Sequence, residues 1–213
     1  MASSVIHLAV ANEINKKLKR NNNKILIGSV APDISKSIGE TKLYSHFLDN
    51  EDTDIPNIER FLSRYKDNLN DDFVLGYFIH LYTDYLWFKY FVTEFSGTDY
   101  ITKLDGTVVE CTEHMLDMYI YNDYTNLNER LIKEYKLDLK PFYVRGETFE
   151  NIIKEIPMDR LNVIMDKTLE IIENSKITKE LVFNMTNINK FIKTAVELTI
   201  AELKEIEVLK WKY

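Results

Sequence analysis

The chain has 213 residues, 45% of them hydrophobic, which is enough to bury one sizeable core. Asp and Glu number 34 against 27 Lys and Arg, and the resulting net charge of −7 argues against nucleic acid as the main partner, because a polyanion would be repelled. A single cysteine, Cys111, excludes an intrachain disulfide and predicts a reducing compartment, the cytoplasm.

The first predicted helix starts at Ser3 or Ser4 as N-cap, and its apolar residues recur with helical spacing as far as Leu18. It contains the first histidine, His7. No basic segment precedes these apolar residues, so we expect a helix of the folded protein and no signal peptide.

The second predicted helix, residues 24–31 (KILIGSVA), is rich in small residues and is stopped by Pro32. Asp33 then projects from the break. The plain interpretation of this Pro-Asp pair is a helix-terminating turn. The alternative is a carboxylate placed between His7 and the next histidine, His46, which stands in the apolar setting YSHFL.

After a predicted helix over 55–69, the helix predicted over 71–95 contains the apolar stretch LGYFIHLYTDYLWFKYF. This stretch is long enough to span a bilayer, but it carries His80, Asp84 and Lys89, so we interpret it as a buried helix and expect no transmembrane segment. His80 and Asp84 lie one turn apart on one face, and Gly76, one turn earlier, lets a backbone or a ligand come close. A buried polar group without a partner costs about 1–3 kcal/mol, so this pair predicts partners elsewhere in the chain.

Three more helices are predicted over 108–136, 158–174 and 187–210, with a loop containing Pro141 and Gly146 between the first two. Only six glycines and four prolines punctuate the chain, and no run of strict alternation suggests a sheet. The sequence therefore predicts an all-α fold, a multi-helix bundle forming a single domain over residues 1–213.

The four histidines all lie within the first 114 residues, and His7, His46 and His80 each have an apolar setting. A lone histidine in such a setting is more often a hydrogen-bonded core residue than a metal ligand. Three of them together with Asp84 favour one shared metal, because separately buried imidazoles would each need an acceptor of their own.

These residues resemble, in order and approximate spacing, the zinc-dependent phospholipase C family, which is related to the S1/P1 nucleases. The resemblance rests on HLAVA, GSVAPD, the lone His46 and LGYFIHLYTDYLW, and it covers roughly the first 95 residues. It implies an all-helical fold that hydrolyses phosphate esters with a cluster of zinc ions. By matching position, it implies a metal site of His7, Asp33, His46, His80 and Asp84, with Asp84 bridging two ions.

The chemistry of these residue types agrees with that expectation. Imidazole and carboxylate suit zinc, and two such ions can hold a phosphoryl group while lowering the pKa of a bound water. The resemblance implies that Asp33 orients or deprotonates this water as the catalytic residue. The expected cofactor is one or two zinc ions, with another divalent metal left open, and the expected partner is a small phosphate ester or a phospholipid head group.

The sequence departs from the family pattern in two places. Secreted members use their N-terminal amine as a metal ligand, and we expect this ligand to be absent because several residues precede the first histidine here. The family also has a later histidine followed one turn on by Glu, whereas Met118 stands four residues after His114. We expect a site built from roughly residues 1–125. Its candidates for an additional ligand are Glu110, His114, Asp117 and Asp123, although Glu110 and Asp117 are more typical of a solvated helical face.

Three functions remain open from the sequence. The first is a cytoplasmic metal-dependent phosphoesterase, the second a non-catalytic helical binding protein with a structural metal, and the third a nucleotide phosphohydrolase of the HD kind, whose adjacent His-Asp pair is missing here. Structural zinc sites are closed by four protein ligands, whereas catalytic sites keep a position for water. Five ligands spread over two ions leave open positions and favour the first function. The substrate and the oligomeric state are not fixed by the sequence.

Overall fold

The computed structural model describes residues 1–97 and 99–206, apart from the side chains of Glu113 and His114. The chain is mostly helical, with 62% of its residues in helices and 3% in strands. The helices are α1 Ser4–Leu18, α2 Asn22–Gly28, α3 Ile34–Ser37, α4 Ile58–Tyr65, α5 Asp72–Leu86, α6 Glu113–Tyr135, α7 Lys140–Tyr143, α8 Leu161–Glu173 and α9 Met185–Glu205, and the strands are β1 Tyr100–Thr102 and β2 Val108–Glu110.

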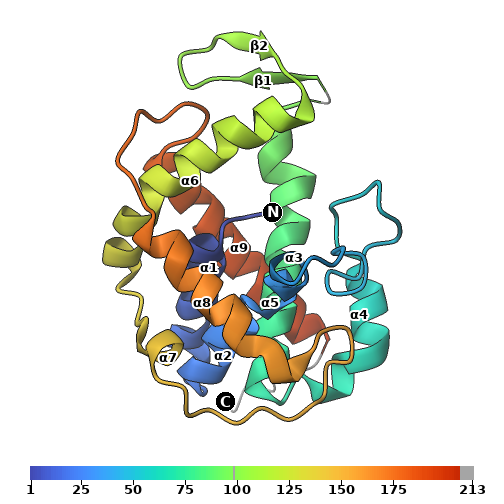
Figure 1. Cartoon of the computed structure of the whole chain (residues 1–213). Helices are drawn as coiled ribbons and strands as arrows, with labels where there is room; N and C mark the ends of the chain where they lie inside the picture. Colours follow the sequence, from blue (N-terminus) through green and yellow to red (C-terminus); the bar gives the residue numbers. More distant parts are fainter. Residues whose placement is uncertain (98, 207–213) are drawn as a thin grey trace.

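Helix α1 lies at the centre of the fold, in contact with α2, α5, α6, α8 and α9 (Figure 1). Its start is the predicted one, because the Ser3 hydroxyl accepts a hydrogen bond from the Ile6 N–H at 3.3 Å. Asp71 caps α5 in the same way, accepting from Phe73 and Val74. After α5 the chain continues as a turn of π-helix, Trp87–Phe91, and then a turn of 3-10 helix, Val92–Glu94.

Helices α2 and α5 touch through their backbones. A Cβ atom on Gly28 would lie 2.3 Å from the Phe73 carbonyl oxygen, and one on Gly76 would lie 2.3 Å from the Ile25 carbonyl oxygen. Both positions therefore require glycine for close approach, and the expectation for Gly76 is confirmed. This contact fixes α2 against the helix that carries His80 and Asp84.

Pro32 does not end the helical path as the sequence predicted. α2 ends at Gly28, and Ala31–Asp33 form a turn of 3-10 helix that leads directly into α3. Proline is tolerated there because the first turn of a helix leaves its N–H groups without intrahelical partners. Asp33 consequently lies inside a rigid helical turn and does not project from a break.

The helix predicted to begin at residue 108 begins instead at Glu113, after a β-hairpin. β1 and β2 pair antiparallel, with Tyr100 opposite Glu110, and Gly106 adopts a φ of +83° in the turn between them. The consecutive β-branched residues Val108 and Val109 suit a strand, and Thr112 then caps α6 by accepting from the Met115 N–H. Figure 1 shows the hairpin at one end of the molecule, beside the start of α6.

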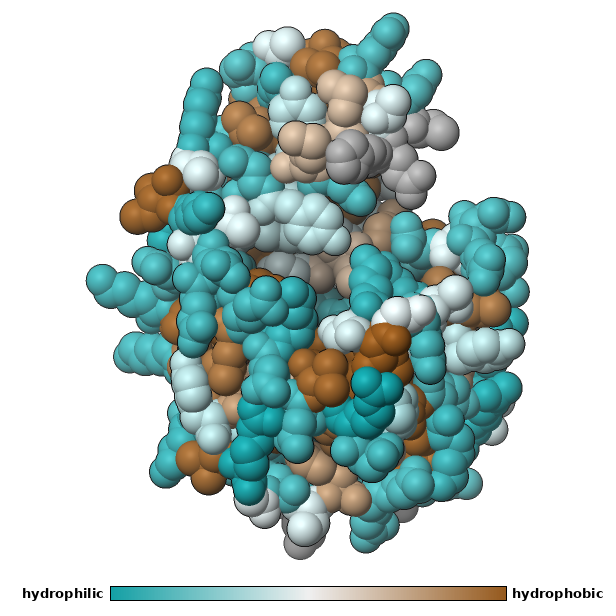
Figure 2. Space-filling view, viewed as in Figure 1, coloured by the Kyte–Doolittle hydropathy of each residue, from teal (hydrophilic) through white to brown (hydrophobic). Residues whose placement is uncertain are grey.

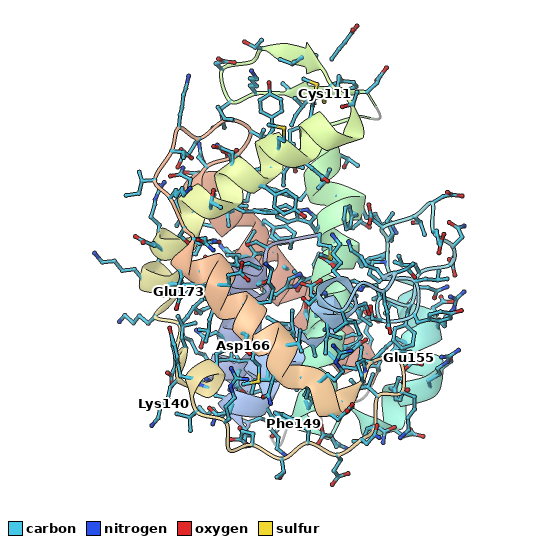
Figure 3. The ribbon with its side chains drawn as sticks, viewed as in Figure 1. Cys111, Lys140, Phe149, Glu155, Asp166 and Glu173 are labelled. Carbon is cyan, nitrogen blue, oxygen red and sulfur yellow. The ribbon has the colours of Figure 1, made fainter. Side chains whose placement is uncertain are left out.

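The segment between α7 and α8 wraps around the opposite end, where Figure 3 labels Phe149 and Glu155. The Phe149 ring packs on Phe73, with centroids 5.1 Å apart, and the Glu155 carboxylate accepts a hydrogen bond from the Tyr65 hydroxyl at 2.6 Å. Cys111 is buried next to the hairpin.

Hydrophilic residues cover much of the face seen in Figure 2, which is hollowed between the lobe with the hairpin and the body below. Within residues 1–97 and 99–206, no helix combines the length and the apolarity needed to cross a membrane. Residues 207–210, expected to complete the last helix, lie outside the described part of the chain.

Candidate metal centre

Five polar side chains from four segments meet inside the apolar core. His7 comes from α1, Asp33 from the 3-10 turn, His46 from the segment before α4, and His80 and Asp84 from α5. Three of them have no exposed surface, and His46 and Asp33 are 1% and 8% exposed. The structure thus brings together the five residues that the sequence singled out.

The ligand atoms of these side chains have the spacing that a bound ion needs. His46 Nε2 lies 3.2 Å from His80 Nε2 and 3.4 Å from Asp33 Oδ1. Asp84 Oδ2 lies 3.4 Å from His80 Nε2 and 3.7 Å from His46 Nε2. Ligands at about 2.0–2.2 Å from a tetrahedral ion are separated from one another by roughly 3.3–3.6 Å. The observed separations fit this geometry.

Hydrogen bonds at the opposite ring nitrogens fix the tautomers of two histidines. His80 Nδ1 lies 2.8 Å from the Ser29 carbonyl oxygen, which only accepts, so Nδ1 carries the proton. His46 Nδ1 lies 3.0 Å from Ser45 Oγ, whose own hydroxyl donates to the Lys42 carbonyl. In the neutral rings both Nε2 atoms then carry lone pairs that face each other at 3.2 Å, a contact that either a bound cation or a proton on His80 Nε2 makes favourable.

Other atoms of the cluster also lack hydrogen-bond partners among the described residues: both ring nitrogens of His7, Asp33 Oδ1 and Asp84 Oδ2. His7 stacks on His80 with ring centroids 3.8 Å apart, and its Nε2 lies 3.3 Å from Asp84 Oδ1. Buried polar atoms are nearly always paired, so four unpaired atoms at one place indicate a ligand. The donor set of three imidazoles and two carboxylates fits a divalent transition metal.

The protonation states favour a dication as well. Burial lowers the pKa of His46 to about 4, although the neighbouring Asp33 carboxylate opposes the shift. Burial also lowers the pKa of His7. For Asp84, burial acts to raise the pKa, but His7 and His80 outweigh it and hold the pKa well below its usual range. At neutral pH the cluster therefore offers His7 and His46 as neutral imidazoles beside ionised carboxylates, whereas Asp33 and Asp84 outweigh burial and raise the pKa of His80.

The surroundings of His46 hold it in place. Phe47, the next residue, adopts a left-handed conformation with φ of 55°, and its ring is buried against Phe61 and Tyr77. The Tyr77 hydroxyl donates to the Ser45 carbonyl at 2.5 Å. A strained backbone conformation next to a site residue persists only where packing overdetermines it, as it does here.

The number of ions depends on how His80 and Asp84 are shared. Two groups of three could hold a metal, His7 with His80 and Asp84, and Asp33 with His46 and His80. His80 has one free lone pair, because its Nδ1 is engaged, so it serves one ion. Asp84 directs Oδ1 towards His7 and Oδ2 towards His80 and His46, so its two oxygens could serve different ions if two were bound.

Among the further ligand candidates, Asp123, Glu110 and Asp117 do not join this cluster. Both oxygens of Asp123 accept backbone N–H groups, from Leu181, Val182 and Phe183 at 2.7–3.0 Å, so the expectation of a ligand there is corrected to a structural role. Glu110 lies on a strand and not on a helix, and both it and Asp117 are exposed. The side chain of His114 lies outside the described part.

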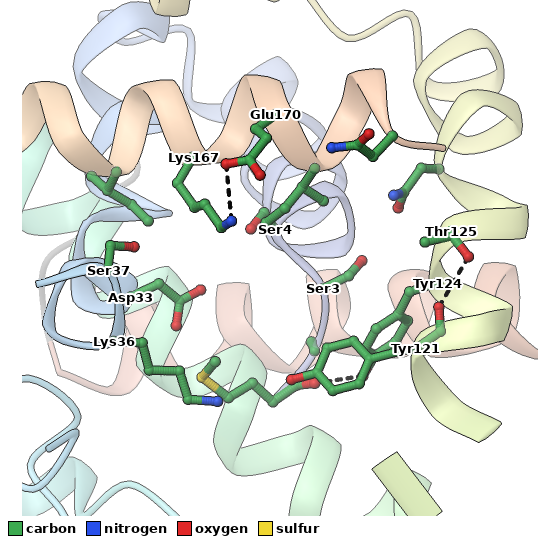
Figure 4. Close-up of a pocket in the computed structure, with 16 residues that line it drawn as sticks. Ser3, Ser4, Asp33, Lys36, Ser37, Tyr121, Tyr124, Thr125, Lys167 and Glu170 are labelled. Atoms are coloured by element: carbon green, nitrogen blue, oxygen red, sulfur yellow. Dashed lines mark hydrogen bonds and ion pairs between the residues drawn. The ribbon is translucent and has the colours of Figure 1, made fainter. Parts of the chain in front are cut away.

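Two features of the site were missed by the sequence interpretation. Lys42, four residues before His46, is half-buried. Burial lowers the pKa of its ammonium, although Asp84 and Asp33 act to raise it. A cavity of about 360 Å³ lies beside Asp33, and its lining includes Lys36 and Tyr121 (Figure 4). The sequence did contain a signal for these features. Two lysines, Lys36 and Lys42, stand between the candidate ligands Asp33 and His46 in a chain that is acidic as a whole.

The first residues of the chain also reach the site, since the Ala2 N–H donates to Asp84 Oδ1 at 2.9 Å.

Comparisons of this chain with models of known protein families, with curated proteins and with solved structures return no match.

Proposed function

We propose that this protein is a metal-dependent phosphoesterase that hydrolyses a small or lipid-like phosphate ester. The observation that carries the proposal is the pair of facing Nε2 atoms of His46 and His80, set between ionised carboxylates, with Asp33 also forming part of a cavity wall. The resemblance to the zinc-dependent phospholipase C family supports the same reaction class.

The metal we propose is zinc, as one or two ions. Imidazole nitrogen favours zinc over magnesium or calcium, and carboxylate oxygen is compatible with it. With two ions, Asp84 would bridge them. When bound, such ions polarise a phosphoryl oxygen and lower the pKa of a bound water.

The chain's own groups have distinct roles in this proposal. Asp33, which lines the cavity, orients the attacking water and accepts its proton. Lys36, which lines the cavity, provides positive charge for the phosphate, which an acidic protein otherwise repels, and Lys42 contributes less because its ammonium lies 3.7 Å from Asp54 Oδ1. The Ser29 carbonyl keeps His80 in the tautomer that leaves Nε2 free.

The test begins with metal analysis of the purified protein, followed by assays on nitrophenyl phosphate, its diester, nucleotides and phospholipids. We expect hydrolysis that a chelator abolishes and added zinc restores. Assayed with saturating zinc, Asp33→Asn should lose at least about 100-fold in kcat, because general base catalysis contributes on this scale. Asp117→Asn, at an exposed position on α6, is the matched control and should keep full activity.

A structural metal without turnover is the competing function, and one observation favours it: His7, His80 and Asp84 have no exposed surface at all. A protein that is fully loaded with metal and shows no chelator-sensitive hydrolysis of any of these esters would establish this alternative and refute the phosphoesterase.

A further inference from the structure

The cavity beside Asp33 has walls from several elements. Tyr121, Tyr124, Thr125 and Asn128 lie on one face of α6, at helical spacings of three and four residues. The opposite wall comes from α8, and the first four residues of the chain lie between them. Figure 4 shows Asp33, Lys36 and Ser37 at one side of the cavity and Tyr121 and Tyr124 at the other.

Asn128 has no partner for its side chain. It has no exposed surface, it lines the cavity, and neither its Nδ2 nor its Oδ1 makes a hydrogen bond to any part of the described chain. Asn126, on the same helix and 3% exposed, behaves differently, because its Oδ1 accepts the Thr178 N–H at 3.1 Å. An amide that is both a donor and an acceptor, left unpaired at a cavity wall, indicates a polar group on the cavity's occupant.

The charges of the lining indicate that this occupant is neutral. The Lys167 ammonium pairs with the Glu170 carboxylate at 2.9 Å, and Asp33 faces His46. Among the described lining residues, no anionic side chain is left for a cationic group, and Lys36 makes no ion pair with them. A cationic alcohol such as an amino alcohol is therefore disfavoured.

The apolar lining and the volume of the cavity further restrict the chemical class of its occupant. Ala2, Ile164, Ile171 and the rings of Tyr121 and Tyr124 provide apolar contact. A volume of about 360 Å³ lies at the lower end of ligand pockets. We propose that this cavity binds the alcohol part of the phosphate ester as a compact, neutral, partly apolar group, and that Asn128 selects an alcohol bearing a further hydroxyl or amide. This assignment rests on the proposed function.

The test compares ω-hydroxyalkyl phosphates of increasing chain length with the matching n-alkyl and ω-aminoalkyl phosphates. At the best chain length, kcat/KM should favour the hydroxylated ester over its alkyl partner by at least about tenfold, because a site built for a hydrogen bond rejects the analogue without it. Asn128→Leu should remove that preference, chiefly by raising the KM for the hydroxylated ester. The aminoalkyl ester should be the poorest of the three.

Asn126→Leu is the matched control. It should lower Tm, because it removes a hydrogen bond, and should keep the substrate preference. Asn128→Leu should keep or raise Tm, because it removes an unpaired buried amide. A fall in Tm equal to that of Asn126→Leu with an unchanged preference would overturn the assignment and give Asn128 a structural role.

Binding without turnover separates this assignment from the proposed function. Calorimetry of the metal-free protein with the free diols and the matching alcohols should show tighter binding of the diol, dependent on Asn128. Diol binding in a protein that hydrolyses no ester would preserve the cavity assignment and refute the phosphoesterase. Hydrolysis of all the esters without any preference would support the phosphoesterase and refute the cavity assignment.

Discussion

Two aspartates, Asp84 and Asp123, are both buried with no exposed surface, yet their surroundings differ in kind. Asp123 accepts hydrogen bonds from three successive backbone N–H groups, those of residues 181–183. Asp84 accepts one backbone N–H, from Ala2, and otherwise faces three imidazoles. Burial of a carboxylate therefore does not identify a functional site, whereas the nature of its partners does.

The reason lies in what each partner can supply. A backbone N–H is always a donor, so the surroundings of Asp123 are complete without a ligand. An imidazole offers either a proton or a lone pair, and the hydrogen bonds at Nδ1 of His46 and His80 leave lone pairs towards Asp84. A cation would complete the second group, so the two regions should respond differently to the same substitutions.

Asp84→Asn is expected to have the largest effect. The amide keeps the shape of the carboxylate but loses its charge and one acceptor, so zinc affinity should fall by more than about 100-fold, beyond the effect of losing an outer-shell partner. Competition with a chromogenic chelator measures the affinity. Asp123→Asn should bind zinc as the unmodified protein does, and equal losses in the two variants would contradict the distinction.

Asp123→Ala should lower the free energy of unfolding by about 2–4 kcal/mol, because it leaves buried N–H groups without acceptors and removes hydrogen bonds to a charged group. Urea denaturation with and without zinc measures this effect. The loss should be the same in both conditions, since the 181–183 contact lies apart from the candidate ligands. A loss that zinc abolishes would place Asp123 at the metal site after all.

The stability of the metal-free protein should decrease as pH falls from about 6.5 to about 4. His46 has a pKa of about 4 in the folded protein, against 6.5 ordinarily, so the unfolded chain binds a proton first and is favoured as pH falls. His7, with its lowered pKa, acts in the same direction, whereas the raised pKa of His80 opposes it. Thermal unfolding across this window measures the slope, which His46→Gln should reduce. A stability that increases towards pH 4 would contradict this account.

Glu110→Gln and Asp117→Asn should have the smallest effects. Both side chains are exposed, and exposed substitutions away from special contacts usually change stability by less than about 0.5 kcal/mol. Metal content and Tm should match those of the unmodified protein. Loss of an equivalent of metal in either variant would extend the site beyond the five buried side chains.

Helical periodicity and capping residues were sufficient to predict most of the helices, as at Ser3 and Asp71. The hairpin was missed because Val108 and Val109 precede α6 with no break in composition. The convergence of the five buried residues was predicted from helical spacing and family resemblance together. Asn128 was not predicted, because the absence of a partner is a property of the folded chain. Asp123 was misinterpreted because the backbone N–H groups that it accepts come from residues 181–183, far away in the sequence.

Asp33 is the one member of the five that also forms part of the cavity wall, while His7, His80 and Asp84 have no contact with solvent. An ion bound among them would exchange with solvent past Asp33, along the route that we propose for the ester. Its residence time would then depend on whether the cavity is occupied, and a bound alcohol would slow its loss to a chelator. The cavity wall at Asp33 would then control both the entry of the ester and the residence time of the metal ion.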